Sequence, residues 1–183
     1  HGNVSAVGLH LYGQLLQEAV NELKTGQPAP TIPEVLLRLP LEGRLSPNLN
    51  LNQSARLNLY QKLAAVRQPS KLLNTAESLL GRPLDDSYDD HLFKNLLVIL
   101  EIKLLAEQAK LREISYQGNN QVGRFTLRWL TKPSETTLKK LKDFDSTWQT
   151  IESGCSAAKQ LAAGAWIDWL KQSLKQIKEI PTN

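Results

Sequence analysis

The side chains that most often carry catalysis are few in this chain and widely spaced. The three histidines, His1, His10 and His91, have no second ligand beside them at metal-binding spacing, and a structural metal needs three or four converging ligands. The single cysteine, Cys155, has no CxxC partner, so we expect a buried small residue rather than a nucleophile. One cysteine also excludes an internal disulfide and fits a reducing compartment such as the cytoplasm.

One acidic run has the composition of a metal site. It contains Asp85, Asp86, Asp89 and Asp90 within six residues, but it lacks the glycine and the terminal glutamate of a calcium loop. Acidic residues that precede a helix favour its positive N-terminal end, which explains the run more simply. The chain also contains no phosphate-binding GxxxxGK[ST] loop and no GxGxxG after a strand. We therefore expect no catalytic residue, metal or cofactor, and the chain is predicted not to be an enzyme.

Basic side chains offer a different chemistry, the binding of phosphates. They gather around one predicted helix (Lys132, Lys139, Lys140, Lys142), along the last predicted helix (Lys159, Lys171, Lys175, Lys178) and beside Trp129 (Arg124, Arg128). Basic residues interleaved with an aromatic ring can bind single-stranded nucleic acid by phosphate contact and stacking. The net charge of +4 is small, however. A solvated basic surface with Trp129 and Trp166 in the core is the alternative interpretation.

The first 111 residues are predicted to be mainly helical. Apolar residues with helical spacing predict helices over 8–24, 54–66, 70–80 (with Ser70 as its N-cap) and from the acidic run to Leu111. In the second of these, Leu57, Tyr60, Leu63 and Ala64 are expected to face inward. Thr31 to Leu39 reads as a short strand between prolines. Residues 40–52 are expected to be an ordered, extended connection packed on a neighbour.

The remaining residues are predicted to mix strands and helices. Strands over 114–117 and 124–130 form a hairpin, Ser134 caps a helix that reaches Phe144, a strand follows over 148–152, and a last helix covers 155–177. The predicted class is therefore α+β: a helix-rich N-terminal half followed by a small antiparallel sheet with two further helices. The length of 183 residues suits a single domain. No apolar stretch approaches the ~18 residues of a membrane span.

Two parts of the chain resemble signature motifs of the bacterial transcription-repair coupling factors. Residues 7–20, VGLHLYGQLLQEAV, are similar to the motif VGFxLYxxLLEEAV. Residues 35–40, VLLRLP, and 55–64, ARLNLYQKLA, look like VxLxxP and RLxLYKRLA at similar spacing. The chain is thus identified as a divergent C-terminal domain of that family. It departs at 45–52, which lack the aromatics and acids of YIPDxYIxD, and at 77–84, where ESLLGRPL replaces ELxDRFGxLP.

The resemblance implies a regulatory role within a longer protein. The parent would be an ATP-driven translocase on double-stranded DNA that removes stalled RNA polymerase and recruits UvrA for nucleotide excision repair. Residues 1–24 would be a helix that links the motor, upstream of residue 1, to a C-terminal regulatory domain over 25–183. That domain would pack on the N-terminal UvrA-binding module of the same chain and mask it.

The expected partners follow from that role. They are the N-terminal UvrA-binding module directly, and UvrA, RNA polymerase and double-stranded DNA through the parent, with no membrane; the chain alone is expected to be a monomer. Because the masked surface is basic in this family, Glu77, Ser78 and Arg82 are the candidate interdomain contacts. The alternative function is an accessory nucleic-acid-binding domain that uses the basic region 124–142.

Overall fold

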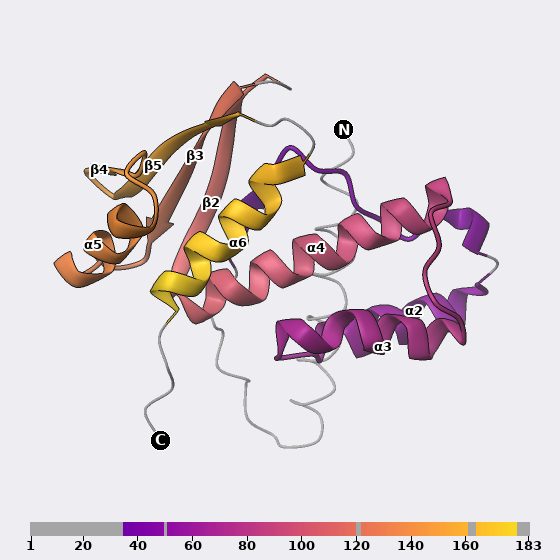
Figure 1. The fold of residues 1–183 in the computed structure, drawn as a ribbon. Coiled ribbons are helices and arrows are strands. Elements are labelled where there is room, and N and C mark those ends of the chain that lie inside the picture. The colour runs from indigo at the N-terminus through magenta and orange to yellow at the C-terminus, as the bar shows by residue number, and fades with distance from the viewer. Residues whose placement is uncertain (1–34, 50, 120–121, 161–163, 179–183) are drawn as a thin grey trace, which may run out of the picture. The chain divides into compact units, whose positions relative to one another are not determined.

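The computed structural model of the chain describes residues 35–49, 51–119, 122–160 and 164–178 (Figure 1). The predicted helix over 8–24, and with it the boundary between residues 24 and 25, lies outside this part. The described residues form two compact units, which we call the helical unit (41–101) and the sheet unit (35–40 and 102–178). The predicted α+β class is confirmed. None of the helices in the described part is long and apolar enough to cross a membrane.

The helical unit is built from α2, α3 and the first part of α4, together with two short 3-10 turns. Their bounds are η1 Pro47–Leu49, α2 Gln53–Ala64, η2 Pro69–Lys71, α3 Leu72–Leu80 and α4 Tyr88–Gln108. The three predicted helices are therefore confirmed in position. The predicted cap Ser70 is wrong, because Ser70 lies in η2 and α3 begins with no side-chain cap.

The buried face of α2 agrees only in part with the predicted one: Leu63 is buried as predicted, and Leu57 is not. Leu59 and Leu63 are its buried residues, each 2% exposed, whereas the predicted inward residue Leu57 is 37% exposed. Tyr60 is half-buried, and the backbone of Leu45 hydrogen bonds with its hydroxyl. The Tyr60 hydroxyl needs a polar partner, so this side chain lies at the edge of the core. Leu59 and Leu63, four residues apart, lie at its centre.

The extended connection packs along α4, as predicted. The Arg44 amide donates to the Leu92 carbonyl at 3.1 Å, and the Asn95 side-chain amide donates to the Glu42 carbonyl at 2.9 Å. Between these bonds the backbone of Gly43 lies against α4, where a Cβ atom would come within 2.4 Å of the Leu96 nitrogen. Any larger residue at this position would force the two segments apart.

The sheet unit contains five strands in the order β1-β2-β3-β5-β4. Their bounds are β1 Leu36–Arg38, β2 Leu111–Gly118, β3 Val122–Trp129, β4 Gln149–Ile151 and β5 Gly154–Gln160. The predicted β2–β3 hairpin is confirmed, with Gly118 opposite Gly123. The edge strand β1 pairs in parallel with β2, so the sheet is mixed rather than wholly antiparallel.

The predicted last helix is wrong in its first third. Cys155 lies in β5, and the helix α6 covers only Ala165–Ile177. The small residues that follow Gly154 suggested a helix, but β5 pairs with β3 on one side and β4 on the other. A Cβ at Gly154 would lie 1.9 Å from the Leu127 carbonyl oxygen, so small residues here serve close strand contact. Tertiary pairing thus overrides local helix preference.

Two helices and a group of aromatic rings cover one face of the sheet. Helix α5, Glu135–Phe144, begins at Ser134, whose hydroxyl accepts a hydrogen bond from the Thr137 amide as predicted. Phe125 on β3 stacks on Trp166 of α6, with ring centroids 5.3 Å apart. The ribbon shows α6 running across the strands (Figure 1). The alternation of buried Phe125, Leu127 and Trp129 along β3 is confirmed.

Candidate interdomain surface

Glu77, the first of the predicted contact residues, is hydrogen bonded to the loop that follows α3, its own helix. The left-handed conformation of Gly81, with φ of 69°, ends α3. The chain then turns back, and the Leu84 amide donates to Glu77 Oε1 at 3.0 Å. Glu77 is half-buried, so one carboxylate oxygen anchors this loop while the group still reaches the surface.

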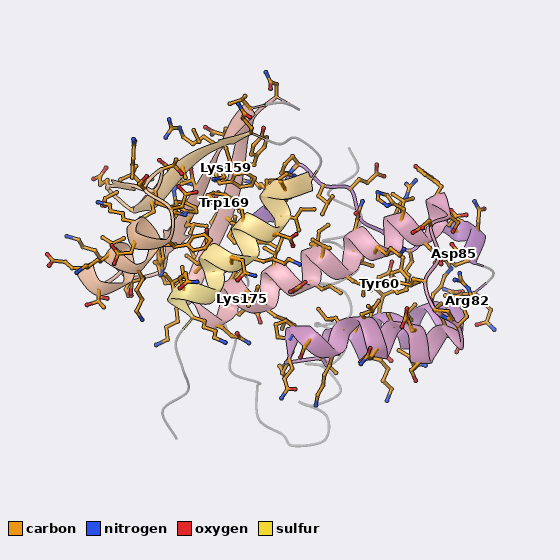
Figure 2. All side chains as sticks on the ribbon, viewed as in Figure 1. Tyr60, Arg82, Asp85, Lys159, Trp169 and Lys175 are labelled. Carbon is orange, nitrogen blue, oxygen red and sulfur yellow. The ribbon has the colours of Figure 1, made fainter. Side chains whose placement is uncertain are left out.

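Arg82 forms the strongest polar contact of this region. Its guanidinium donates to both oxygens of Asp90, at 2.5 and 2.8 Å, and the Asp85 amide donates to the same carboxylate at 2.8 Å. The Asp90 side chain is fully buried, whereas 44% of the Arg82 side chain is exposed. The hydrogen bonds from Arg82 lower the pKa of Asp90 to about 2, although burial opposes this shift. Figure 2 shows Arg82 beside Asp85.

Ser78, the third predicted residue, is exposed and lines an open depression on α2 and α3. The other lining residues are Lys62, Lys71, Asn74, Thr75 and Leu79. Two of them are lysines and none is acidic. The three predicted contact residues therefore have different surroundings in the structure. Glu77 anchors a loop, Ser78 has an exposed hydroxyl, and Arg82 is one partner of an ion pair.

The acidic run at the start of α4 makes polar contacts within the helical unit. Lys94 donates to Asp86 at 2.9 Å, and the Ser46 hydroxyl donates to Asp89. Within the described residues, no group of three or more histidines, cysteines or acids could hold a metal ion. His91 is exposed on α4, while His1 and His10 lie outside the described part.

Cys155 is fully buried in β5. Burial raises the pKa of its thiol, which Lys142 only partly offsets. A thiol with a raised pKa carries little thiolate at neutral pH, so this side chain is suited to packing rather than to nucleophilic chemistry.

The predicted stacking aromatic of the basic region is not accessible. Trp129 is 8% exposed, and its ring nitrogen donates to the Ala109 carbonyl at 3.0 Å. Its neighbour Arg128 forms an ion pair with Glu113 at 3.1 Å. Trp166 is buried as well. Both tryptophans therefore lie in the core, as the alternative interpretation of the basic residues required.

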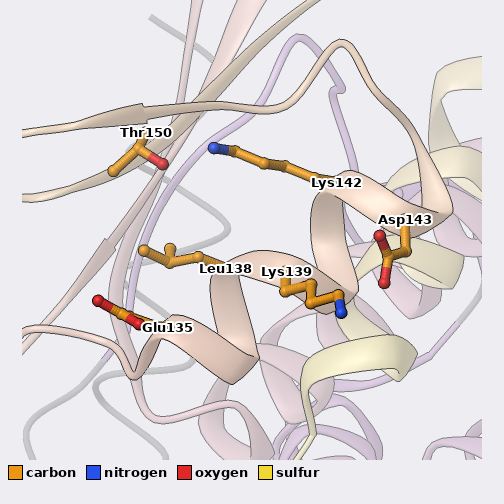
Figure 3. Close-up of a pocket in the computed structure, with 6 residues that line it drawn as sticks. All are labelled: Glu135, Leu138, Lys139, Lys142, Asp143 and Thr150. Carbon is orange, nitrogen blue, oxygen red and sulfur yellow. The ribbon is translucent and has the colours of Figure 1, made fainter.

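The lysines on α5 lie beside acidic side chains. A depression beside α5 and β4 is lined by Glu135, Leu138, Lys139, Lys142, Asp143 and Thr150 (Figure 3). Two acids balance two lysines there, so this surface has little net charge with which to attract a phosphate backbone.

Lys159 is held by a partly buried network of side chains. Its ammonium lies 2.6 Å from Asp145 and 4.7 Å from the centre of the Trp169 ring; Figure 2 shows the two side chains together. The Trp169 ring nitrogen also donates to Asp145, at 2.7 Å. Burial pushes the pKa of Asp145 upward, but hydrogen bonds from Lys159, Thr147 and Trp169 outweigh it and hold that pKa below its usual range.

One basic residue was missed by the sequence prediction. Arg38 on β1 faces the same side of the sheet as Arg128, and both donate to Glu113, at 3.2 and 3.1 Å. Alternation along β1 puts Arg38 and Leu37 on opposite sides of the sheet. The proximity of Arg38 to Arg128 depends on the pairing of β1 with β2, and pairing between segments so far apart in the sequence carries no local signal.

Comparison with known proteins gives a consistent result. No protein-family model matches the chain. In an alignment of 192 positions that covers 98% of this chain, it is 27% identical to the transcription-repair-coupling factor of Staphylococcus aureus strain USA300. In an alignment of 120 positions that covers 64% of this chain, it is 34% identical to that of Staphylococcus haemolyticus. The chain is a relative of the transcription-repair coupling factors.

The fold of the chain resembles that of a solved C-terminal domain. The crystal structure of a C-terminal domain of transcription-repair coupling factor has the same fold, with a TM-score of 0.59 at 14% identity, covering 81% of this chain and 96% of that one. The chain spans only 10% to 15% of the length of the two staphylococcal coupling factors.

One coupling-factor motif has a clear structural basis. Arg56, in the segment that resembles RLxLYKRLA, donates from its guanidinium to the carbonyls of Leu51 at 3.2 Å and Leu45 at 3.4 Å, and also to that of Ser46. These bonds attach α2 to the extended connection before it. Within the described residues this motif thus supports the fold rather than a catalytic centre.

Proposed function

We propose that the chain is a non-catalytic regulatory domain of an ATP-dependent DNA translocase that couples removal of stalled RNA polymerase to nucleotide excision repair. In this role it packs on the N-terminal UvrA-binding module of the same parent and masks it until the parent engages polymerase. The observation that carries the proposal is the match to coupling factors over 98% of the chain. Masking is allosteric in the strict sense if the closed and open states differ in affinity for UvrA.

The surface proposed for the contact is the exposed side of α3, with Glu77 and Ser78 at its centre. The second oxygen of Glu77 is available for a basic group, since Oε1 already accepts from the Leu84 amide. Arg82 would act indirectly, because its bond to Asp90 holds the loop on which Glu77 is anchored. Contacts between domains of one chain are commonly modest and polar, so a single charge can shift the balance between closed and open states.

Direct binding tests the partner assignment. The 183-residue chain is titrated with the isolated UvrA-binding module of its parent by calorimetry. Covalent tethering supplies an effective concentration near the millimolar range, so a Kd as weak as about 1 mM would suffice in the parent. Failure to bind at such concentrations would count against the proposal.

Substitution of Glu77 in the full-length parent tests the residue assignment. Glu77→Arg should increase UvrA binding in the absence of polymerase, and Glu77→Gln should do so to a smaller extent, because the amide oxygen can still accept from Leu84. Glu152→Arg, at an exposed acid in the β4–β5 turn, is the matched control and should change nothing. If Glu152→Arg increases UvrA binding as much as Glu77→Arg does, the α3 surface is not the contact.

The proposal also requires that the domain hydrolyse no ATP. The chain has no GxxxxGK[ST] loop, which in nucleotide hydrolases cradles the phosphates. ATPase activity that stays with the purified chain through further purification steps, and that is lost on heat denaturation, would contradict a non-catalytic role.

A further inference from the structure

The side of the sheet opposite the aromatic core carries one row of polar side chains that crosses all five strands. Strand register places Arg38 opposite Ser115, Ser115 opposite Thr126, and Thr126 opposite Ser156; Gln149 of β4 is paired with Ser156. Adjacent strands lie about 4.8 Å apart, so the row spans about 19 Å. We call this side the outer sheet face. Every residue of the row has a side-chain donor. Ser115 and Ser156 are buried, at 7% and 3% exposed, whereas Arg38 and Gln149 at its two ends are exposed.

Arginines surround this row. Arg124 and Arg128 lie on β3, two residues before and after Thr126, and therefore on the same side of the sheet. Arg128 and Arg38 share the carboxylate of Glu113, while Arg124 is exposed and donates to the Ser156 hydroxyl at 3.1 Å. Three guanidinium groups and one carboxylate leave the described part of this face with a net positive charge. Arginine presents a planar fork of donors that matches phosphate geometry.

The centre of the outer sheet face contains no large apolar side chain. Its apolar residues in the described strands, Leu36, Val122, Ile151 and Ala158, lie toward the edges or the strand ends. Stable protein interfaces have an apolar, aromatic-rich centre, and single-stranded nucleic acid is bound by stacking on aromatic rings. The ring stacking of β3, through Phe125, occurs on the opposite side of the sheet. A surface that carries three arginines and a net positive charge is instead suited to a phosphate backbone, which offers only acceptors and negative charge.

We propose that the outer sheet face binds the phosphodiester backbone of duplex nucleic acid, weakly and without regard to sequence. Arg124 makes the principal phosphate contact, and Arg38 and Arg128, held in place by Glu113, make the flanking contacts. This surface differs from the basic region predicted from the sequence, since it uses β1 and excludes both Trp129 and the lysines of α5. It is also independent of the proposed masking role.

The test measures binding of the 183-residue chain to a fluorescein-labelled DNA duplex of about 20 base pairs by anisotropy, as a function of NaCl concentration. A Kd near 100 µM at low salt, with a slope of log K against log salt of about −2 to −3, is expected for two or three phosphate contacts. Arg124→Gln should weaken binding several-fold and reduce that slope by about 1. The double variant Arg38→Gln, Arg124→Gln should abolish measurable binding.

The control is Lys175→Gln on α6, which removes one exposed positive charge from a helix that is not part of the outer sheet face. It should bind duplex as the unchanged chain does, and both single variants should keep the thermal midpoint. The proposal is overturned if the unchanged chain does not bind, or if Lys175→Gln weakens binding as much as Arg124→Gln. It is equally overturned if a single strand binds more than ten times tighter than the duplex, or if a polyglutamate peptide of equal charge binds as tightly.

Discussion

The two units of this molecule are stabilised by different chemistry. The sheet unit contains all four tryptophans of the chain, which lie between residues 129 and 169. Two of them, Trp148 and Trp169, stack with ring centroids 5.0 Å apart. The helical unit has no tryptophan, and polar ties join its segments: Arg82 with Asp90, Arg56 with three carbonyls, and Glu77 with the Leu84 amide.

This difference between the two units shows which charged side chains are available to bind a partner. In the helical unit, the charged residues that the sequence nominated as contacts are largely occupied by structural bonds. In the sheet unit, aromatic packing stabilises one side of the sheet, and Arg124 on the other side remains exposed. A charge in the sequence therefore predicts a binding role only after its internal partners are known.

The largest expected effect is on the aromatic core of the sheet unit. Trp148 is 1% exposed, and its ring nitrogen donates to the Ser173 hydroxyl at 3.2 Å. Trp148→Ala should lower the free energy of unfolding by about 4 kcal/mol, from lost packing and the cavity left behind. Urea denaturation followed by the fluorescence of the remaining tryptophans measures this. A change below about 1 kcal/mol would mean that the stack does not stabilise the unit.

The next effect concerns the buried carboxylate of the helical unit. Asp90→Ala removes the acceptor of three hydrogen bonds and should cost about 3 kcal/mol. The loss should appear in the helical signal measured by circular dichroism. Asp86→Ala is the control, because the Asp86 side chain is fully exposed in its pair with Lys94, and its removal should leave the unfolding midpoint unchanged.

Acid should destabilise the helical unit through its buried carboxylate. The pKa of Asp90 in the fold is about 2, below its ordinary value near 3.9, so its stabilising contribution is complete above about pH 4 and is lost as the pH falls toward 2. The expected loss is about 2 kcal/mol. Urea unfolding followed by helical dichroism at pH 5 and at pH 2 measures this loss. A free energy of unfolding that stays the same at the two pH values would contradict the assignment.

The smallest expected effects test the corrected orientation of α2. Tyr60→Ala should cost about 2 kcal/mol, because the ring is only half-buried, and Leu57→Ala should cost less than about 1 kcal/mol at an exposed position. Leu63→Ala, at a fully packed position, should exceed both. If Leu57→Ala is the most destabilising of the three, the original prediction of the inward face was right.

The sequence predicted elements whose signals are local. Helical spacing located α2, α3 and α4, and alternation located β3 and its buried side chains, because each pattern repeats within a few residues. Ser134 was recognised as a cap by its place before a helical segment. The motifs over 7–20, 35–40 and 55–64 together indicated the relationship to coupling factors.

What the sequence could not predict depends on distant partners. Strand β5 looks helical in isolation and becomes a strand because β3 and β4 flank it. Arg38 and Arg128 both form ion pairs with Glu113, and they can do so only because β1 pairs in parallel with β2. Likewise, Arg82 was nominated as an outward contact because nothing near it in the sequence shows that Asp90 becomes fully buried.

The central claim is that this domain holds its parent in a closed state, and deletion of the domain tests it most directly. Binding of UvrA to the full-length parent is measured without polymerase, beside the same parent truncated before residue 1. The account predicts that the intact parent binds UvrA weakly and that the truncated parent binds it at least about ten times more tightly, the factor that corresponds to 1.4 kcal/mol of coupling. Equal affinity of the two proteins for UvrA would contradict it.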